Sequence, residues 1–356
     1  MSNHIENEGK IKVGISIGDL NGIGLEVIIK TFLDNRMLLT CTPIIYGSSK
    51  VLSFHRKILG IPEFNTHLIR SADAAIPKKV NVINCWEEEV QMDLGKASDI
   101  SAQYAFKSLE AATIDLHTGK IDALVTAPID KHTMQNAGFK FPGHTEYLAE
   151  KLHAQNYLMF MVSDTMRIGM VTGHIPIKDV PAHLSTDAIL QKIKIMNESL
   201  IKDFGIRKPK IAVLGLNPHA GDNGTLGVED KEIIVPAVKK AMESGMVVFG
   251  PYSADGFFGS STFKQFDGVI AMYHDQGLIP FKALAFTTGV NYTAGLPAIR
   301  TSPDHGTAYD IAGKNIASEE SFREAVYLAC DTFIKRKEYQ QLTSNPLKIS
   351  VLSRDH

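Results

Sequence analysis

The feature that most constrains the fold is an alternation of short apolar runs with amphipathic stretches along the chain. The apolar runs end in turns that contain Gly or Pro, and they cover residues 12–19, 43–47, 122–128, 167–174, 210–219 and 268–274. The amphipathic, helix-like stretches cover residues 25–32, 100–116, 145–152, 186–204 and 231–244. This alternation is typical of buried parallel strands joined by helices. It predicts an α/β fold in which a largely parallel sheet lies between layers of helices.

The length of 356 residues predicts two domains, because one domain usually takes roughly 100–200 residues. No Pro-, Gly- or Ser-rich linker and no internal repeat divides the chain. We therefore expect two α/β/α domains that are joined by shared strands or crossovers and enclose a cleft. Apolar residues make up 44% and charged residues 21% of the chain, a composition that excludes general disorder.

The charge balance argues against nucleic-acid and membrane partners. The 37 Lys and Arg residues face 39 Asp and Glu residues, so the formal net charge is only −2. The three cysteines form no CxxC pair, which speaks against a disulfide framework or a cysteine-based zinc site. The first ten residues lack the apolar segment of a secretory signal, and no apolar run approaches the ~20 residues of a membrane span. These features predict a cytoplasmic protein.

Three strand-like runs end directly in histidine, at His174, His219 and His274. Ligands of open α/β sheets bind outside the carboxyl ends of the strands, so the three imidazoles are candidates for a shared divalent-metal site. Asn217 or Asp275 would orient a ligating imidazole without binding the metal itself. The alternative is a set of tight turns capped by Asn and Asp side chains.

A second group of residues is suited to an anionic ligand. His144 and Thr145 open a helix, where free backbone N–H groups and the helix dipole favour an anion. Lys282 and Arg300 are natural partners of a phosphate or carboxylate, and Asn291 lies in the same Gly- and Pro-rich segment as Arg300. The alternatives are a simple N-cap role for Thr145 and a solvated surface position for Arg300.

The glycine-rich segment 18–24 matches no known nucleotide-binding motif. Its sequence, GDLNGIG, departs from the spacing G-x-G-x-x-G, and no P-loop motif occurs in the chain. We interpret the segment as a tight turn between a strand and a helix, with Asp19 as a candidate cleft residue.

Taken together, the motifs closely resemble the 4-hydroxythreonine-4-phosphate dehydrogenase family of vitamin B6 biosynthesis. The resemblance spans about residues 11–335, and it is carried by TAPIDK (126–131), PGHTEYLA (142–149), GHIPIKDV (173–180), LNPHAGDNG (216–224), AMYHDQGLIPFK (271–282) and GLPAIRTSPDHGTAYDIAGK (295–314). It implies the isocitrate/isopropylmalate dehydrogenase-like fold and a homodimer with the active site in the cleft, at the dimer interface. The first domain would comprise residues 11–135 plus 290–356, and the second, with the metal ligands and the dimer interface, residues 136–289.

The resemblance also implies roles for individual residues. The divalent metal (Zn, Mg or Co) would be shared between subunits and bound by His174, His219 and His274. The substrate contacts would be His144, Thr145, Lys282, Asn291 and Arg300. The loop 305–314 would bind the adenosine part of the cofactor through His305, Gly306, Thr307, Ala308 and Asp310. A carboxylate at Asp310 favours NAD over NADP, because it accepts ribose hydroxyls and repels a 2′-phosphate.

The implied reaction is the NAD-dependent oxidation of the secondary hydroxyl of 4-(phosphooxy)-threonine. Loss of CO₂ from the resulting 3-oxo acid then gives 3-amino-2-oxopropyl phosphate, a step in pyridoxal 5′-phosphate synthesis. A bound metal stabilises charge on the reacting oxygen. The candidates for the base that takes the hydroxyl proton are Lys282 and Asp255, with His144 as a third.

Three departures from the family pattern leave the substrate open. Leu20 and Leu25 replace two prolines of the family's N-terminal motif, and Gly256 replaces a threonine. We expect these positions near the cleft, so threonate 4-phosphate or erythronate 4-phosphate is an alternative substrate. A metallohydrolase with three histidine ligands is an alternative of another class, but it leaves the loop 305–314 without a function.

Overall fold

The structure is a computed structural model that describes residues 10–345 of the chain. The segment 1–9, which contributes to the prediction of a protein without a secretory signal, lies outside the described residues. The same holds for residues 346–356, the end of the predicted first domain. None of the helices in the described part of the chain combines the length and apolarity that crossing a membrane demands.

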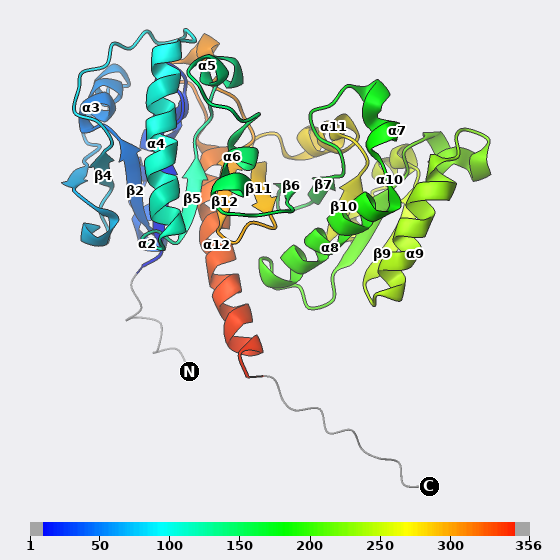
Figure 1. Cartoon of the computed structure of the whole chain (residues 1–356). Coiled ribbons are helices and arrows are strands. Elements are labelled where there is room, and N and C mark those ends of the chain that lie inside the picture. Colours follow the sequence, from blue (N-terminus) through cyan, green and yellow to red (C-terminus); the bar gives the residue numbers. More distant parts are fainter. Residues whose placement is uncertain (1–9, 346–356) are drawn as a thin grey trace.

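A single twelve-stranded sheet runs through the molecule (Figure 1), in the order β3-β4-β2-β1-β5-β12-β11-β6-β7-β10-β8-β9. The strands are β1 (Lys12–Ser16), β2 (Thr42–Gly47), β3 (His67–Ile69), β4 (Asn81–Asn84), β5 (Ala123–Thr126), β6 (Leu158–Val162), β7 (Arg167–Met170), β8 (Lys210–Leu214), β9 (Val247–Tyr252), β10 (Gly268–Ala271), β11 (Val290–Ala294) and β12 (Arg300–Pro303).

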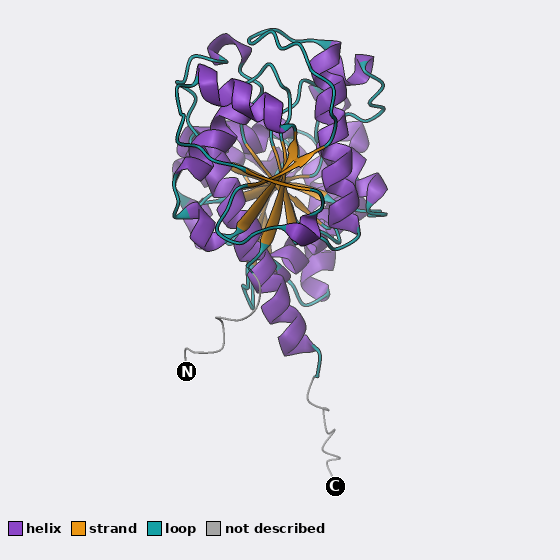
Figure 2. Ribbon diagram, turned by 90° about the vertical axis from the view of Figure 1, so that its left-hand side faces the viewer, coloured by secondary structure: helices purple, strands orange, loops and turns teal. Residues whose placement is uncertain are grey.

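Helices cover both faces of this sheet, as the view along the molecule shows (Figure 2). They are α1 (Gly24–Leu33), α2 (Met37–Thr40), α3 (Ser49–Ile58), α4 (Asp99–His117), α5 (Lys131–Asn136), α6 (His144–Lys151), α7 (Val180–His183), α8 (Thr186–Lys202), α9 (Val235–Glu243), α10 (Ala254–Gly259), α11 (His274–Ala285) and α12 (Glu320–Thr343). The predicted α/β fold, with helices on both sides of a sheet, is therefore confirmed.

The sheet consists of two parallel blocks that run in opposite directions. Strands β3, β4, β2, β1, β5 and β12 form one block, and β7, β10, β8 and β9 form the other. Strand β11 pairs antiparallel with β12 and β6, and β6 pairs antiparallel with β7. The prediction of a largely parallel sheet holds within each block, but the antiparallel connection between the blocks was not predicted.

Five of the six predicted apolar runs contain a strand that ends earlier than the run, whereas β2 ends with its run at Gly47. The run 12–19, for example, holds β1 only as far as Ser16, because the chain then enters a turn in which Gly18 has φ 66°. A Cβ atom at Gly18 would lie 2.3 Å from the carbonyl oxygen of Pro128, so this turn requires glycine. Within each parallel block, the strand ends and the following turns therefore reach the same edge of the sheet.

A buried histidine holds this first turn in place. His55 in α3 is 3% exposed, and its Nε2 lies 3.0 Å from the carbonyl oxygen of Leu20. Burial lowers the pKa of His55 to about 4, below its ordinary value near 6.5. The imidazole is therefore neutral at pH 7 and donates its ring N–H to the turn.

The burial of His55 predicts that the free energy of unfolding decreases at acidic pH. The unfolded chain takes up a proton at His55 near pH 6.5, whereas the folded chain resists it until about pH 4, so the contribution of His55 is complete above pH 6.5 and falls as the pH drops. We expect about 3 kcal/mol of stability to be lost through this group between pH 7 and pH 4. Urea unfolding of the wild type and of His55→Gln at both pH values checks this, and equal losses in the two proteins would contradict it.

Candidate active site

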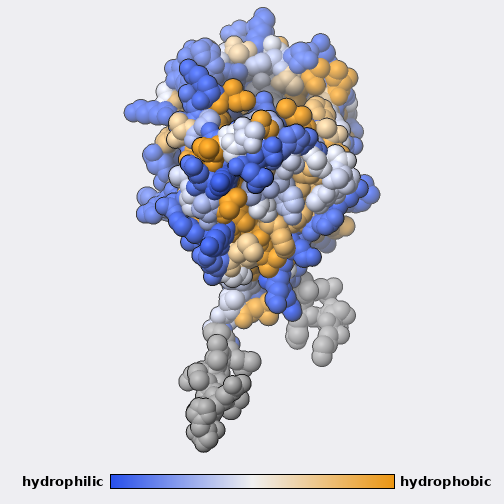
Figure 3. Space-filling model, turned by 90° about the vertical axis from the view of Figure 1, so that its right-hand side faces the viewer, coloured by the Kyte–Doolittle hydropathy of each residue, from blue (hydrophilic) through white to orange (hydrophobic). Residues whose placement is uncertain are grey.

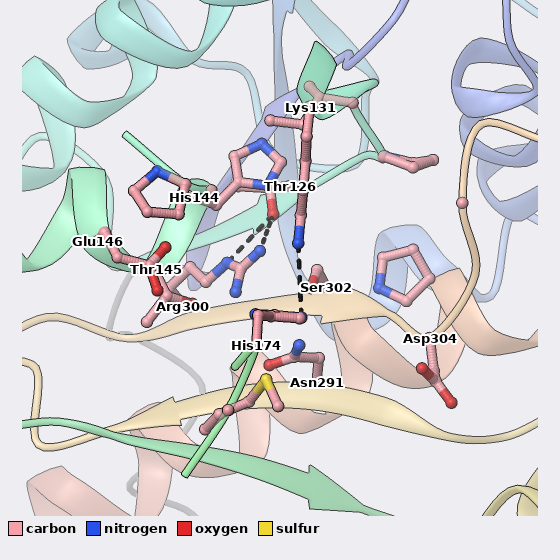
Figure 4. A pocket seen from close by; sticks show the side chains of 18 of the residues that line it. Thr126, Lys131, His144, Thr145, Glu146, His174, Asn291, Arg300, Ser302 and Asp304 are labelled. Carbon is pink, nitrogen blue, oxygen red and sulfur yellow. Dashed lines mark hydrogen bonds between the residues drawn. The ribbon is translucent and has the colours of Figure 1, made fainter. Parts of the chain in front are cut away.

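A cavity of about 580 Å³ opens over the centre of the sheet, where the strand direction changes (Figure 4). Residues from both blocks line it, which fits the rule that ligands of open α/β sheets bind at such a switch point. The polar and charged lining residues are Thr126, Lys131, His144, Thr145, Glu146, Tyr157, His174, Lys192, Lys282, Asn291, Arg300, Ser302, Asp304 and His305. The predicted substrate contacts His144, Thr145, Lys282, Asn291 and Arg300 thus all line one cavity.

Arg300, the first residue of β12, is the most unusual charge in the cavity. It is 3% exposed, yet it forms no ion pair with a described residue. Its guanidinium donates to Thr126 Oγ1 from Nε (3.1 Å) and Nη2 (2.7 Å), and to Thr293 Oγ1 from Nη1 (3.3 Å). Burial lowers the pKa of Arg300 to about 10, so the side chain is still charged at pH 7. A buried charge without a counterion indicates an anionic ligand.

The charges of the cavity differ in sign from those of the whole chain. Four basic side chains line it, from Lys131, Lys192, Lys282 and Arg300, but only two carboxylates, from Glu146 and Asp304. Among these six groups the structure shows one ion pair, between Lys282 Nζ and Asp304 Oδ1 at 3.4 Å. The net positive cavity in a chain of net charge −2 is thus a local feature suited to an anionic substrate.

The start of α6 forms one wall of the cavity. Gly143 is the N-cap residue and caps with no side chain, so the alternative interpretation of Thr145 as the N-cap is wrong. Thr145 Oγ1 lies 3.5 Å from Thr293 Oγ1, next to Arg300. His144 Nε2 is buried and has no hydrogen-bond partner. Burial, followed by the charges of Arg300 and Lys131, lowers the pKa of His144, which leaves a neutral imidazole for a ligand.

The structure brings together two of the three predicted metal ligands. The ring centroids of His174 and His274 are 5.3 Å apart. His274 Nδ1 lies 2.7 Å from Asp275 Oδ1, as predicted for an orienting partner, and His174 Nε2 lies 3.5 Å from Lys131 Nζ. Within residues 10–345, no three His, Cys, Asp or Glu side chains are close enough to hold a metal ion.

His219 and Asp255 lie away from the cavity of their own chain. His219 is exposed in the turn Pro218–Gly224, where it has φ 52°, and Asp255 is exposed in α10. Hydrogen bonds, first from the hydroxyl of Ser253 and then from the backbone N–H of Gly256, and the nearby charge of His219 lower the pKa of Asp255. Neither side chain lines the cavity.

The loop predicted to bind the cofactor begins at the cavity and is held by the turn 18–24. His305 and Gly306 line the cavity, the Thr307 carbonyl accepts from the N–H of Ile23 (3.0 Å), and Asp310 is exposed. Ala308 has φ 43°, a left-handed turn.

The prediction that Asp19 faces the cleft is wrong, because the side chain is 1% exposed. Its oxygens accept from Ser101 Oγ (2.6 Å), the N–H of Asn21 (2.8 Å) and the hydroxyl of Tyr309 (2.9 Å). Burial raises the pKa of Asp19 despite these bonds. The carboxylate therefore fastens the loop to the turn and is closed to a ligand.

The departures from the family pattern do not contact the cavity, contrary to our expectation. Leu20 and Leu25 are 0% exposed and belong to the hydrophobic core. Gly256 is exposed in α10, and a Cβ atom there would meet no atom within 4 Å. The two leucines pack in the core, and none of the three residues lines the cavity of its own chain.

Sequence reasoning missed several residues of the cavity, above all Lys131, Glu146 and Lys192. Lys131 and Glu146 stand in two of the motifs that we quoted, and Lys131 begins α5, soon after the end of β5. Lys192 lies in the middle of α8, where nothing in the sequence distinguishes it from a solvated lysine.

A cation-rich cavity at the switch point of an α/β sheet indicates a protein that binds a small anionic ligand. The family model described as pyridoxal phosphate biosynthetic protein PdxA matches residues 39–329, and the chain belongs to this family. The 4-hydroxythreonine-4-phosphate dehydrogenase of Bacteroides thetaiotaomicron is 50% identical over 342 residues, 96% of this chain and 94% of the relative. The enzyme of the same name from a Sulfurihydrogenibium species is 43% identical, over 90% of this chain and 97% of the relative.

Solved structures agree with this assignment. The 4-hydroxythreonine-4-phosphate dehydrogenase of Klebsiella pneumoniae has a TM-score of 0.77 and 34% identity, and covers 91% of this chain and 100% of its own. A terephthalate 1,2-cis-dihydrodiol dehydrogenase of Burkholderia xenovorans, 24% identical with a TM-score of 0.61 over 90% of this chain and 98% of its own, shares the fold. The chain is therefore a dehydrogenase of the predicted family, and its α/β fold is that of the family's solved structures.

Proposed function

We propose that this enzyme oxidises the secondary hydroxyl of 4-(phosphooxy)-threonine with NAD and a divalent metal and then releases CO₂, in pyridoxal 5′-phosphate synthesis in the cytoplasm. The buried, unpaired guanidinium of Arg300 is the observation that carries the proposal. A phosphate or carboxylate would supply the counterion that the protein itself withholds. The names of the relatives support the choice of substrate.

The substrate would be held by groups that lack partners in the free protein. These groups are His144 Nε2 and Asn291 Oδ1, both buried without a hydrogen bond, and Arg300, which has hydrogen bonds but no ion pair. Thr145 offers a hydroxyl beside Arg300, and Lys282 a charge at the opposite, Asp304 side of the cavity. Unsatisfied buried polar atoms destabilise a protein unless a ligand or water pairs with them, so this set is suited to a polar substrate.

We assign the metal to His174 and His274 of one chain, completed by His219 from a second copy. The contact of His274 Nδ1 with Asp275 leaves Nε2 free as a ligand atom, a common arrangement for metal-binding histidines. Imidazole ligands suit Zn²⁺ or Co²⁺ better than Mg²⁺. A divalent cation bound there would stabilise negative charge on the reacting oxygen.

A homodimer would bring the third histidine into place. His219 follows β8, next to the edge strand β9, at the end of the molecule shown in Figure 3. That end shows apolar patches among polar side chains, and the exposed apolar residues of α9 and β9 are Val235, Met242, Val247 and Phe249. Exposed apolar patches of this kind are typical of protein interfaces. Asp255 would approach the neighbouring cavity by the same route.

The loop from His305 to Asp310 would bind NAD, with His305 and Gly306 toward the cavity, Thr307 and Ala308 in the turn, and Asp310 at the ribose. NAD would accept the hydride from the substrate carbon. The hydrogen bond of Tyr309 to buried Asp19 keeps the loop in one position before the cofactor binds, which lowers the entropy lost on binding.

The chain's own residues would then handle the proton and the carboxylate. Lys282 accepts the hydroxyl proton when it is deprotonated, and Asp304, 3.4 Å away, stabilises the ammonium that results. The oxidised product carries a carboxylate β to a carbonyl, so the C–C bond electrons flow to that carbonyl as CO₂ leaves. The neutral His144 can donate a hydrogen bond without adding charge.

The two predicted domains meet at this cavity. We propose that residues 11–135 plus 290–356 form the first, cofactor-binding domain, and residues 136–289 the second. The parallel pairing of β12 with β5 and the packing of α12 on β12 support the return of the chain to its first domain.

Absorbance of reduced nicotinamide tests the proposal directly. The purified enzyme with NAD, Zn²⁺ or Co²⁺ and 4-(phosphooxy)-threonine should produce NADH, and a chelator should abolish this until metal is restored. NADH from threonate 4-phosphate or erythronate 4-phosphate alone would assign the alternative substrate. Phosphate release without any change in absorbance would instead indicate a metallohydrolase.

A further inference from the structure

One carboxylate in the cavity has no partner in the protein. Glu146, in the first turn of α6, forms no hydrogen bond and no ion pair with any residue from 10 to 345, although four Lys and Arg side chains share its cavity. The other lining carboxylate, Asp304, is already paired with Lys282. Figure 4 shows Glu146 beside Thr145 and Arg300, on the side of the cavity where the anion would bind.

Once the ion pair of Lys282 and Asp304 is set aside, four charged side chains of the cavity remain. Arg300 has no acidic partner, Lys131 contacts the imidazole of His174, and Lys192 donates to the carbonyl of Tyr157 at 2.6 Å. Three cations and one carboxylate, Glu146, thus remain without a counterion among the described residues. A ligand that neutralises the set carries up to three negative charges and one positive charge.

A phosphorylated amino acid carries this charge pattern. Its phosphate contributes about −1.5 to −2 charges at pH 7, its carboxylate one negative charge and its ammonium group one positive charge. A phosphorylated hydroxy acid such as threonate 4-phosphate has the same anions but a hydroxyl in place of the ammonium. It would leave Glu146 facing two substrate anions without a cation.

We propose that Glu146 binds the ammonium group of the substrate and selects phosphorylated amino acids over their hydroxy-acid analogues. The inference rests on the proposed function and makes the substrate class more specific. Arg300, with Lys131 and Lys192, takes the anionic groups, and Glu146 takes the single cation. A charged hydrogen bond of this kind is worth enough to separate two substrates that differ in one group.

A capping role does not account for this side chain. Glu146 is the third residue of α6, and a Glu at this position often reaches back to the N–H of the N-cap residue. In the described chain no hydrogen bond joins Glu146 to Gly143. Its carboxylate instead favours the charged forms of Arg300 and His174, so it lies within electrostatic reach of both.

The test compares kcat/KM for 4-(phosphooxy)-threonine and threonate 4-phosphate in the wild type, in Glu146→Gln and in Glu150→Gln. Glutamine keeps the size of the side chain and removes its charge. Glu150 is an exposed glutamate one turn further along α6, so it is the matched control. We expect Glu146→Gln to lower kcat/KM for the amino substrate about 10- to 100-fold, to leave or raise that for threonate 4-phosphate, and Glu150→Gln to change neither.

The outcomes separate the inference from the function on which it rests. Equal losses for both substrates in Glu146→Gln, or no loss for either, would overturn the role of Glu146 while the proposed function stands. Absence of NADH from 4-(phosphooxy)-threonine in the wild type would reject both. Retained turnover of threonate 4-phosphate shows that the variant is folded, so a selective loss supports the inference.

Discussion

Replacement of Arg300 by methionine is expected to abolish most of the activity without destabilising the free enzyme. We expect kcat/KM to fall on the order of 10²- to 10³-fold, because the anionic substrate loses a buried, hydrogen-bonded cation. The free energy of unfolding should stay the same or rise. The guanidinium is 3% exposed and, within residues 10–345, donates only to the hydroxyls of Thr126 and Thr293, so no ion pair offsets its desolvation.

Two measurements check this prediction. Steady-state kinetics gives the loss of activity, and urea unfolding without ligand gives the stability. Added 4-(phosphooxy)-threonine should raise the melting temperature of the wild type and not that of Arg300→Met, because only the wild type binds it tightly. A variant within threefold of wild-type kcat/KM, or one that loses several kcal/mol of stability, would show that Arg300 has a structural role instead.

The sequence predicts the strand ends of this fold better than the connection between its halves. A continuous apolar run followed by a Gly-containing turn is a local signal, and it located β1, β2, β5, β7, β8 and β10. Strands β11 and β6 pair antiparallel across the middle of the sheet, and that pairing depends on contacts between distant segments. Local periodicity carries no information about it.

The same division holds for the site. His144 and Arg300 were predicted from residue type and motif, and they do line one cavity. The sequence predicted three histidine ligands of a metal, but the single chain does not bring them together. His219 lies apart from His174 and His274. Lys192 was missed since its position on the cavity depends on how α8 packs, and Asp19 was misplaced since its partner Tyr309 is 290 residues away.

A second buried arginine, Arg336, differs from Arg300 because it forms an ion pair with a buried carboxylate. Arg336 in α12 donates from Nε to Asp203 Oδ1 at 2.6 Å, and Asp203 also accepts from the hydroxyl groups of Tyr292 (2.6 Å) and Ser199 (2.7 Å). Both partners are nearly inaccessible, at 9% and 3% exposure. The network joins the end of α8 to α12 and β11, and thus connects the two predicted domains.

Replacement of Asp203 by alanine should therefore destabilise the protein strongly, by about 3–5 kcal/mol, because it leaves a buried guanidinium without its counterion. Replacement of both charges, in Asp203→Leu with Arg336→Met, should destabilise much less than the sum of the single changes, since no unpaired charge then remains. Urea unfolding of the two single variants and the double variant measures this coupling. Additive losses would show that the pair contributes little beyond packing.

The network should also influence the active site through one strand. Successive side chains of a strand point to opposite faces, so Tyr292 joins the network while its neighbours Asn291 and Thr293 face the cavity and Arg300. Loss of Asp203 frees β11 on one face, and we expect KM to rise with a smaller change in kcat. An unchanged KM in a destabilised Asp203→Ala would mean that β11 is held by its strand pairing with β12 and β6 alone.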